Sequence, residues 1–157
     1  MSKNEKKISN IVCQNRKASF NYFFQNIYEA GIELLGPEVK SLRLGKASIN
    51  ESYASDTNGK LFLINSNIPI YAAANNFNHD PTRQRELLVS KKERNKLLGL
   101  IKKEGVTLVP LSLYFNNKGF AKIDIGIAKG KKKEDKRESI KLRDWNRQKS
   151  RIMKENN

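Results

Sequence analysis

The sequence is short of the residues that most enzymatic and metal sites require. Cys13 is the single cysteine and His79 the single histidine among 157 residues. A disulfide within the chain and a cysteine-rich zinc site are therefore excluded, and a catalytic triad would depend on His79 with no nucleophile motif beside it. No Gly-Lys pair completes the spacing of a phosphate-binding loop. We therefore expect no catalytic activity, no metal and no cofactor.

Long apolar runs are also missing. No stretch of about 18 apolar residues occurs, so no membrane span is predicted. Residues 1–9 are polar, which predicts a frayed N-terminus and no signal peptide. We therefore expect a protein of the reducing cytoplasm that does not contact membranes.

Positive charge is what the chain has in excess. It carries 31 Lys and Arg against 16 Asp and Glu, a net charge of +15. Such a balance predicts a polyanionic partner. Because Lys and Arg that neutralise phosphates release counterions, binding to a nucleic acid should weaken steeply with salt.

The most basic segment is residues 129–157, with twelve Lys and Arg, five Asp and Glu, and a net charge of +7. It cannot bury enough apolar surface to offset its ordering entropy, so we expect it to be disordered when free. Yet it has no Pro, and no Gly beyond its second residue, while Leu142, Trp145 and Ile152 share one side of a helix beside Met153. We interpret it as a tail that becomes helical against a polyanion; the alternative is a solvated basic tail without a specific role.

Residues 10–128 are interpreted as a β-rich body. The apolar and aromatic residues from 19 to 35 predict a strand that bends, or a hairpin around Ala30-Gly31, although a helix over 18–28 competes. Further strands are predicted at 47–55, 60–66, 68–74, 87–89, 106–115 and 120–128. The Asn58-Gly59 pair between two of them indicates a tight hairpin turn.

Two helices accompany these strands. The first, near 37–44, has Pro37 at its first position and is closed by Gly45. The second, near 91–104, begins at a capping box formed by Ser90 and Glu93. About six short strands in hairpin order, with one helix before the last hairpin, favour a small closed or partly open barrel of the oligonucleotide-binding type. The expected class is mainly β with accessory helices (α+β).

Candidate RNA contacts in the body are the bases that no core pattern explains. They are Arg16, Lys17, Arg43, Lys46, Arg83, Arg85 and Lys122. Candidates for stacking on nucleobases are Tyr22, Tyr28, Tyr53 and Trp145. A position at the edge of the core is the simpler explanation for most of the tyrosines, and His79 is interpreted as a loop residue and not as a base.

Glu29 is the acid of most interest, because it lies beside Ala30-Gly31 in a body with few acids. A lone carboxylate on a basic RNA-binding face can accept a hydrogen bond from a base edge or a 2′-hydroxyl. A salt bridge to a nearby Lys explains it equally well from composition. Paired carboxylates could be sought among Glu29, Glu33 and Asp124, for which solvation at the surface is the simpler explanation.

Many blocks of the chain, from about Asn10 to Lys154, are similar in order and composition to one known family. The blocks are Tyr28-Glu29-Ala30-Gly31-Ile32, Glu38 to Arg43, Asp80 to Leu88, Leu111 to Tyr114, Ala128 to Lys132, Asp135-Lys136-Arg137, Ile140-Lys141, Arg143-Asp144-Trp145 and Arg151-Ile152-Met153. They resemble the SsrA-binding protein, or SmpB, family. The resemblance implies an oligonucleotide-binding-type barrel that binds the tRNA-like domain of transfer-messenger RNA and delivers it to stalled ribosomes for trans-translation, the rescue that tags the unfinished peptide.

The resemblance also implies partners and site residues. The partners are the RNA, the decoding centre and mRNA channel of the small ribosomal subunit and, indirectly, the elongation factor and alanyl-tRNA synthetase that act on that RNA. In the body, Glu29, Leu88 and Lys122 match positions tied to RNA binding. In the tail, the implied ribosome-binding residues are Lys131, Lys132, Lys133, Asp135, Lys136, Arg137, Lys141, Arg143, Trp145, Ile152 and Met153. Glu134 is a departure, because some members place there a histidine suited to stacking on a decoding-centre base.

Composition alone leaves two other classes open. A structural ribosomal protein is also small and basic with a disordered tail, but it would co-purify stoichiometrically with every ribosome. An RNA nuclease is disfavoured by the missing metal cluster and the single histidine, and turnover of RNA would be its mark.

Overall fold

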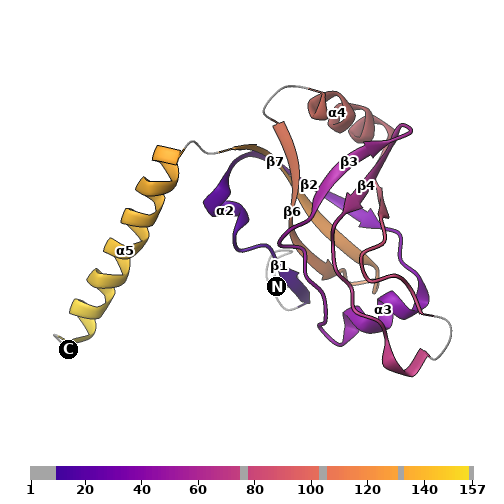
Figure 1. Ribbon diagram of the computed structural model, residues 1–157, viewed down its shortest axis with the longest axis horizontal. Coiled ribbons are helices and arrows are strands. Elements are labelled where there is room, and N and C mark those ends of the chain that lie inside the picture. Colours follow the sequence, from indigo (N-terminus) through magenta and orange to yellow (C-terminus); the bar gives the residue numbers. More distant parts are fainter. Residues whose placement is uncertain (1–9, 75–77, 103–105, 131–132, 156–157) are drawn as a thin grey trace.

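The computed structural model describes residues 10–74, 78–102, 106–130 and 133–155 (Figure 1). In chain order the elements are β1 (Ile11–Gln14), α2 (Ala18–Asn21), β2 (Tyr22–Ile32), α3 (Gly36–Arg43), β3 (Tyr53–Thr57), β4 (Lys60–Ile64), the 3-10 turn η1 (Ala72–Ala74), β5 (Arg85–Leu88), α4 (Lys91–Ile101), β6 (Val106–Phe115), β7 (Ala121–Gly130) and α5 (Lys133–Glu155). The strands curl around one core, while α5 stands apart from them (Figure 1).

The described strands form one antiparallel sheet in the order β1-β6-β3-β4-β5-β2-β7, and β6 also pairs with β7. The sheet therefore closes on itself, but unevenly. Strands β2 and β6 pair with β7 over most of their length, whereas β3 meets β6 only at Ala54 opposite Leu108. This oligonucleotide-binding-like arrangement confirms the mainly β class with accessory helices, although the barrel is far from regular.

Strand β2 runs unbroken for 11 residues. A register shift between Phe24 and Ile27 bends it, so the bend lies earlier than Ala30-Gly31, which are inside the strand and form no hairpin. The competing helix is confined to the four residues of α2.

The β3–β4 hairpin turns at Asn58-Gly59, with φ angles of 53° and 78° that suit Asn and Gly. The strand predicted at 68–74 is wrong. Residue 69 is a proline, which has no backbone N–H for a ladder. The neighbouring Ile68 N–H donates instead to Pro81 O at 3.0 Å.

Helices α3 and α4 lie where the sequence predicts them. Leu42 of α3 and Leu97 of α4 are each 1% exposed and pack into the main core. After α3, Gly45 adopts a φ of 73°. At the start of α4, Ser90 Oγ accepts from Glu93 N–H at 3.3 Å.

Strand β7 supplies the centre of the main core through Ile123, Ile125 and Ile127, which are all buried. Between two of these inward residues, Gly126 faces the other side of the sheet. A Cβ at Gly126 would lie 2.6 Å from Phe24 Cδ1, so only glycine lets the Phe24 ring lie against the strand.

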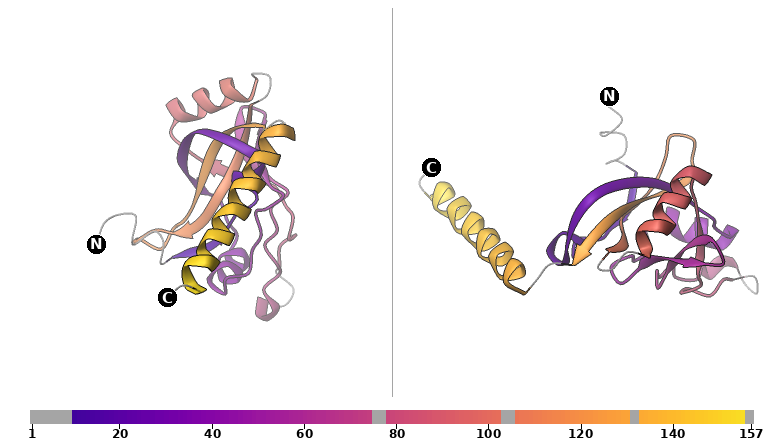
Figure 2. Two further views of the ribbon diagram at one scale, coloured as in Figure 1. Left: turned by 90° about the vertical axis from the view of Figure 1, so that its left-hand side faces the viewer. Right: turned by 90° about the horizontal axis from the view of Figure 1, so that it is seen from above.

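Residues Lys133–Glu155 form helix α5, which is 23 residues long. The segment is rich in helix formers and exceeds the length of about 12–15 residues below which isolated helices are marginal. That the tail is disordered when free stays a prediction. The helix projects away from the sheet (Figure 2). One contact with the body places the Arg143 guanidinium 5.8 Å from the centre of the Phe20 ring. No helix of the described ranges is long and apolar enough to cross a membrane.

Candidate nucleic-acid interface

Three neighbouring strands bring Leu88, Gly31 and Lys122 into one row. Gly31 of β2 lies opposite Leu88 of β5 on one side and opposite Lys122 of β7 on the other. Residues directly opposite in antiparallel strands share a face. The intervening residues Ala30 and Ile123 point into the core, so this row faces outward. We name Glu29, Gly31, Leu88 and Lys122 the β5–β2–β7 face.

Gly31, in the middle of this row, leaves room for the Leu88 side chain. A Cβ added there would lie 3.2 Å from Leu88 Cβ, closer than ordinary packing. Leu88 itself is 51% exposed. Gly31 itself is buried, because the Leu88 side chain lies over it. The face thus offers an apolar side chain and a cation on the two strands that flank β2.

Glu29 belongs to a hydrogen-bonded group that spans β2, β6 and β7. It lies opposite Asp124 in the sheet. The Tyr114 hydroxyl donates to Glu29 Oε2 and lies 3.3 Å from Asp124 Oδ1, and Ser112 Oγ donates to Asp124 Oδ2 at 3.3 Å. Burial, and then the hydrogen bond to Glu29, raises the pKa of Tyr114 well above its ordinary value. The phenol therefore stays a neutral donor that orients both carboxylates.

This group answers the question of paired carboxylates. Glu29 pairs with Asp124 across two strands, while Glu33 lies beyond the end of β2. The sequence pattern pointed to the acids but missed Tyr114 and Ser112, because only the strand register places them beside Glu29. The remaining body candidates are scattered over the surface. Arg16 and Lys17 are exposed before α2, and Arg43 and Lys46 are exposed after α3.

Arg85 is a correction to the predicted RNA contacts. Its side chain is fully buried, its Nε lies 3.3 Å from Glu38 Oε1, and it donates to Ser66 and Pro81 oxygens. Arg83 forms a two-point ion pair with the same carboxylate and is 27% exposed. The prediction that Arg85 contacts RNA is therefore wrong for this fold. Its buried guanidinium binds Glu38 of α3 and the oxygens of Ser66 and Pro81, and so links α3 to the start of β5.

Nucleophilic and metal chemistry find no support among the described residues. Burial raises the pKa of Cys13 to about 11, so its thiol is a poor nucleophile. His79 is buried and donates from Nε2 to Ile68 O at 2.7 Å, a structural bond within a loop. The described part of the chain contains no cluster of three or more His, Cys, Asp or Glu able to hold a metal.

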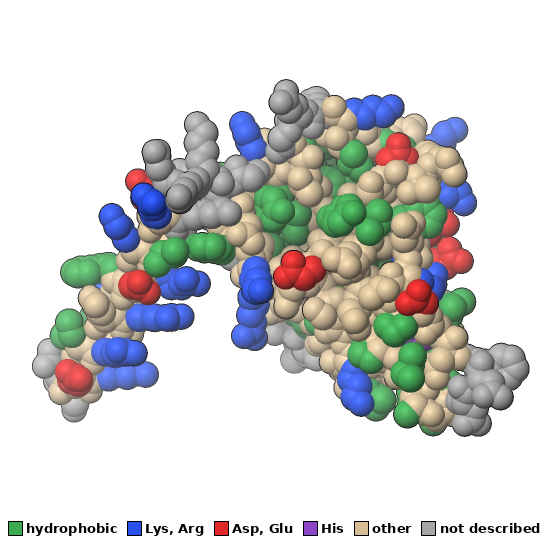
Figure 3. Space-filling model, viewed as in Figure 1, with side chains coloured by type: hydrophobic (Ala, Val, Ile, Leu, Met, Phe, Trp, Pro, Cys, Tyr) green, Lys and Arg blue, Asp and Glu red, His purple; other side chains and the backbone are tan. Residues whose placement is uncertain are grey.

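The tail residues lie on α5 where they are described. Lys131 and Lys132 fall outside the described residues, as do the side chains of Lys133, Asp135 and Lys136. The exposed members are Arg137, Lys141, Arg143, Trp145, Ile152 and Met153. Several Lys and Arg side chains project from the side of the helix toward the body, and hydrophobic side chains project from its outer side (Figure 3). Trp145 is 63% exposed, so its side chain is not buried against the part of the body that the structure describes.

Comparison with known proteins shows the family of the chain. The family model described as SmpB protein matches residues 12–155. SsrA-binding proteins of Rhizobium leguminosarum bv. trifolii and Agrobacterium fabrum are 56% and 58% identical, over 95% of this chain and 94% and 93% of theirs. A chain from a solved structure described as "tmRNA-SmpB: a journey to the center of the bacterial ribosome" is 44% identical, with a TM-score of 0.66 over 82% of this chain and 93% of its own. The chain belongs to the SmpB family.

Proposed function

We propose that the protein is a non-enzymatic adaptor that binds the tRNA-like domain of transfer-messenger RNA and delivers it to stalled ribosomes for trans-translation. The observation that carries this proposal is the β5–β2–β7 face. Three strands bring Glu29, Leu88 and Lys122 together there, in a chain that belongs to the SmpB family. Its relatives are named for binding SsrA, and its structural neighbour is described together with tmRNA and the ribosome.

On this face, recognition is mainly of shape. Lys122 contacts a phosphate, and Leu88 packs on a sugar or an unstacked base. Glu29, held by Tyr114, accepts a hydrogen bond from a 2′-hydroxyl or a base amine. A carboxylate repels phosphate, so it favours RNA that presents a donor at that point and discriminates against a regular helix backbone.

The second part of the proposal concerns α5. A 23-residue helix is about 35 Å long. We assign it to the empty mRNA channel, with its bases against ribosomal RNA and Trp145, Ile152 and Met153 against an apolar surface near the decoding centre. Because the ribosome is cytoplasmic, the protein acts in the cytoplasm. Elongation factor and alanyl-tRNA synthetase act on the RNA and meet the protein only indirectly.

Binding of the purified protein to transfer-messenger RNA, with an elongator tRNA as competitor, tests the first part across a salt series. We expect selective binding that persists at physiological salt. Equal, weak binding to both RNAs that collapses with salt would instead describe a generic basic protein. A structural ribosomal protein would remain on every ribosome through a high-salt wash, whereas an adaptor would not.

Deletion of residues 130–157 tests the second part. We expect affinity for the tRNA-like RNA to stay within a few-fold of the full chain, and peptide tagging on stalled ribosomes to be abolished. Equal loss of both would show that the tail belongs to the primary RNA site.

A further inference from the structure

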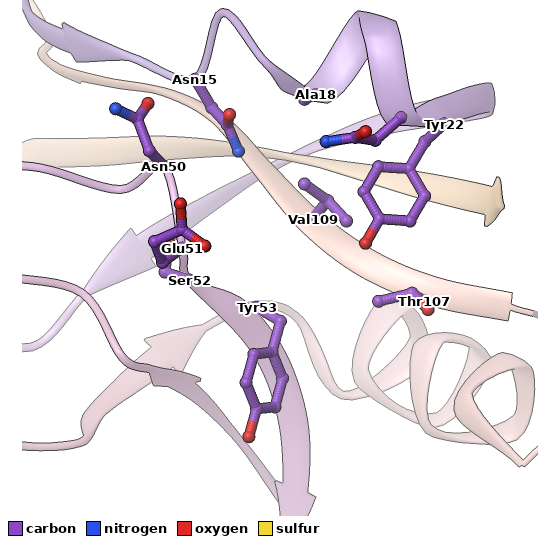
Figure 4. A pocket seen from close by; sticks show the side chains of 10 residues that line it. Asn15, Ala18, Tyr22, Asn50, Glu51, Ser52, Tyr53, Thr107 and Val109 are labelled. Carbon is purple, nitrogen blue, oxygen red and sulfur yellow. The ribbon is translucent and has the colours of Figure 1, made fainter. Parts of the chain in front are cut away.

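A recess lies on the body, lined by residues of α2, β2, β3, β6 and the loop before β3 (Figure 4). Its volume is about 190 Å³. It is lined by Asn15, Ala18, Asn21, Tyr22, Asn50, Glu51, Ser52, Tyr53, Thr107 and Val109. Tyr22 and Gly31 are nine residues apart on β2, roughly 30 Å along an extended strand. A ligand of the recess is therefore separate from a ligand of the outward row.

The recess exists because β3 and β6 pair over one residue pair only. Strands β3 and β6 pair only at Ala54 and Leu108, and the adjacent residues Tyr53 and Thr107 both line the opening. Figure 4 shows the Tyr22 and Tyr53 rings on different sides of the recess, with the Glu51 carboxylate directed into it. The gap is thus present in the chain without any bound ligand.

Asn15 fixes one wall. Its Nδ2 donates to Pro110 O at 3.1 Å, and its backbone N–H donates to Leu111 O at 2.8 Å. Because a carbonyl only accepts, the amide nitrogen must be the atom that faces Pro110. The amide oxygen, Oδ1, is then left buried beside the recess without a hydrogen-bond partner.

Among the other polar groups of the wall, Ser52 donates to Ile49 O and Glu51 pairs with Lys17, whereas four groups in the described part of the chain are uncommitted. Within the described ranges, the side-chain amides of Asn21 and Asn50 make no hydrogen bond, and neither do the hydroxyls of Tyr22 and Tyr53. Amides offer donors and acceptors together, and tyrosine rings offer flat apolar faces. This combination matches a planar group with both donors and acceptors on its edge.

Size and charge narrow the ligand further. The volume is below the 300–1,000 Å³ of sites for drug-sized molecules, so the recess admits one small ring system. At its rim the exposed Lys17 Nζ lies 3.8 Å from Glu51, and Arg16 is adjacent in sequence. Cations at the rim suit the phosphates on either side of a base.

We propose that this recess binds one unstacked nucleobase of the RNA that the protein carries, with the base stacked on Tyr53 and its edge against Asn21 and Asn50. The inference rests on the proposed function and adds a second anchoring point to it. Two contact points at the two ends of β2 fix the orientation of a folded RNA, which a single contact row cannot do.

Substitution of Tyr53 in the full-length chain tests this site. Tyr53 is 43% exposed, so its replacement leaves the core intact. We expect Tyr53→Ala to weaken binding of the tRNA-like RNA by about 5- to 100-fold, the range for loss of one stacked base, and Tyr53→Phe to stay within about twofold. The matched control is Tyr71→Ala, because Tyr71 is a half-buried tyrosine whose ring lies under Lys40 at 5.5 Å, away from the recess.

A direct probe separates this inference from the proposed function. Each of the four nucleoside 5′-monophosphates is added to the full-length chain, and the side-chain amide signals of Asn21 and Asn50 are followed by NMR. Shifts at these amides that Tyr53→Ala removes support the recess even if selective RNA binding fails. Selective RNA binding that Tyr53→Ala and Tyr71→Ala leave equally intact, with no shifts at these amides, overturns the recess and leaves the adaptor function standing.

Discussion

The body and α5 treat charge in opposite ways. In the body, Glu38 is fully buried between Arg83 and Arg85, and these guanidinium groups and the backbone N–H of Leu35 are all directed at it. On α5, every described side chain from residue 140 to 155 is exposed. Charged residues therefore form buried ion pairs that stabilise the body, whereas on α5 they are exposed and available to a partner.

The contrast shows which charges are compensated inside the fold and which are left for a partner. A buried ion pair persists only when each charge is compensated within the fold, so the ion pairs of Glu38 with Arg83 and Arg85 need no other molecule to explain them. An exposed helix with an apolar side gains little from its own fold, so its pattern must be explained by a surface outside the protein. Four experiments test this difference between the body and α5, in order of decreasing expected change in the free energy of unfolding.

Glu38→Ala should cost about 3–5 kcal/mol of stability, because it leaves the Arg85 guanidinium buried without its counter-ion. Urea unfolding of the full-length chain measures it. The matched control is Glu51→Ala, whose partner Lys17 is mostly exposed, with an expected cost of about 0–1 kcal/mol. Equal losses in the two variants would remove the distinction between buried and surface charge.

Acid should weaken the body through the same residue. Burial alone would raise the pKa of Glu38, but hydrogen bonds from Arg83 and the Arg85 charge hold it below its ordinary value of 4.5. A lowered folded-state pKa gives stability that is present above 4.5 and is lost as pH falls below it. Thermal unfolding between pH 3 and 7 should show this decline, and Glu38→Gln should flatten it. A decline of the same size in Glu38→Gln would place the titration elsewhere.

Packing gives a smaller effect. Gly126→Ala should cost about 1–3 kcal/mol, because the added Cβ would lie 2.6 Å from the Phe24 ring and force it to move. Gly99→Ala, in the middle of α4 with nothing within 4 Å of the new Cβ, should instead stabilise the protein by about 0.5–1 kcal/mol. Chemical denaturation of both variants tests the pair, and equal effects would show that neither site is as described.

The sequence predicts helices and strands better than it predicts the contacts between side chains that are distant in the chain. Periodicity and punctuation located α3, α4 and the β6–β7 hairpin, because those signals are local. The strand at 68–74 failed because Pro69 and a long-range bond from Ile68 to Pro81 override its apolar pattern. In α5, the helix agrees with the predicted apolar side and the helix formers, whereas disorder of the free tail stays a prediction.

The candidate interface shows the same division. Resemblance to the family pointed to Glu29, Leu88 and Lys122, and strand register brings them onto one face. Nothing local separates Arg83 from Arg85, two residues apart in the chain, yet one guanidinium is partly exposed and the other is fully buried. Only the placement of Glu38 across 45 residues or more decides between them.

The smallest effect on stability should come from the tail. Leu142→Pro removes a hydrogen bond in the middle of α5 and should break the helix there. Because α5 makes little contact with the body, we expect body unfolding to shift by less than about 0.5 kcal/mol while the helical circular dichroism signal falls and peptide tagging is lost. Trp145 is the single tryptophan, so its fluorescence reports the tail alone and should show no transition when the body unfolds. A Trp145 transition that coincides with body unfolding would mean that the helix folds as part of the body, and the contrast between the two regions would fail.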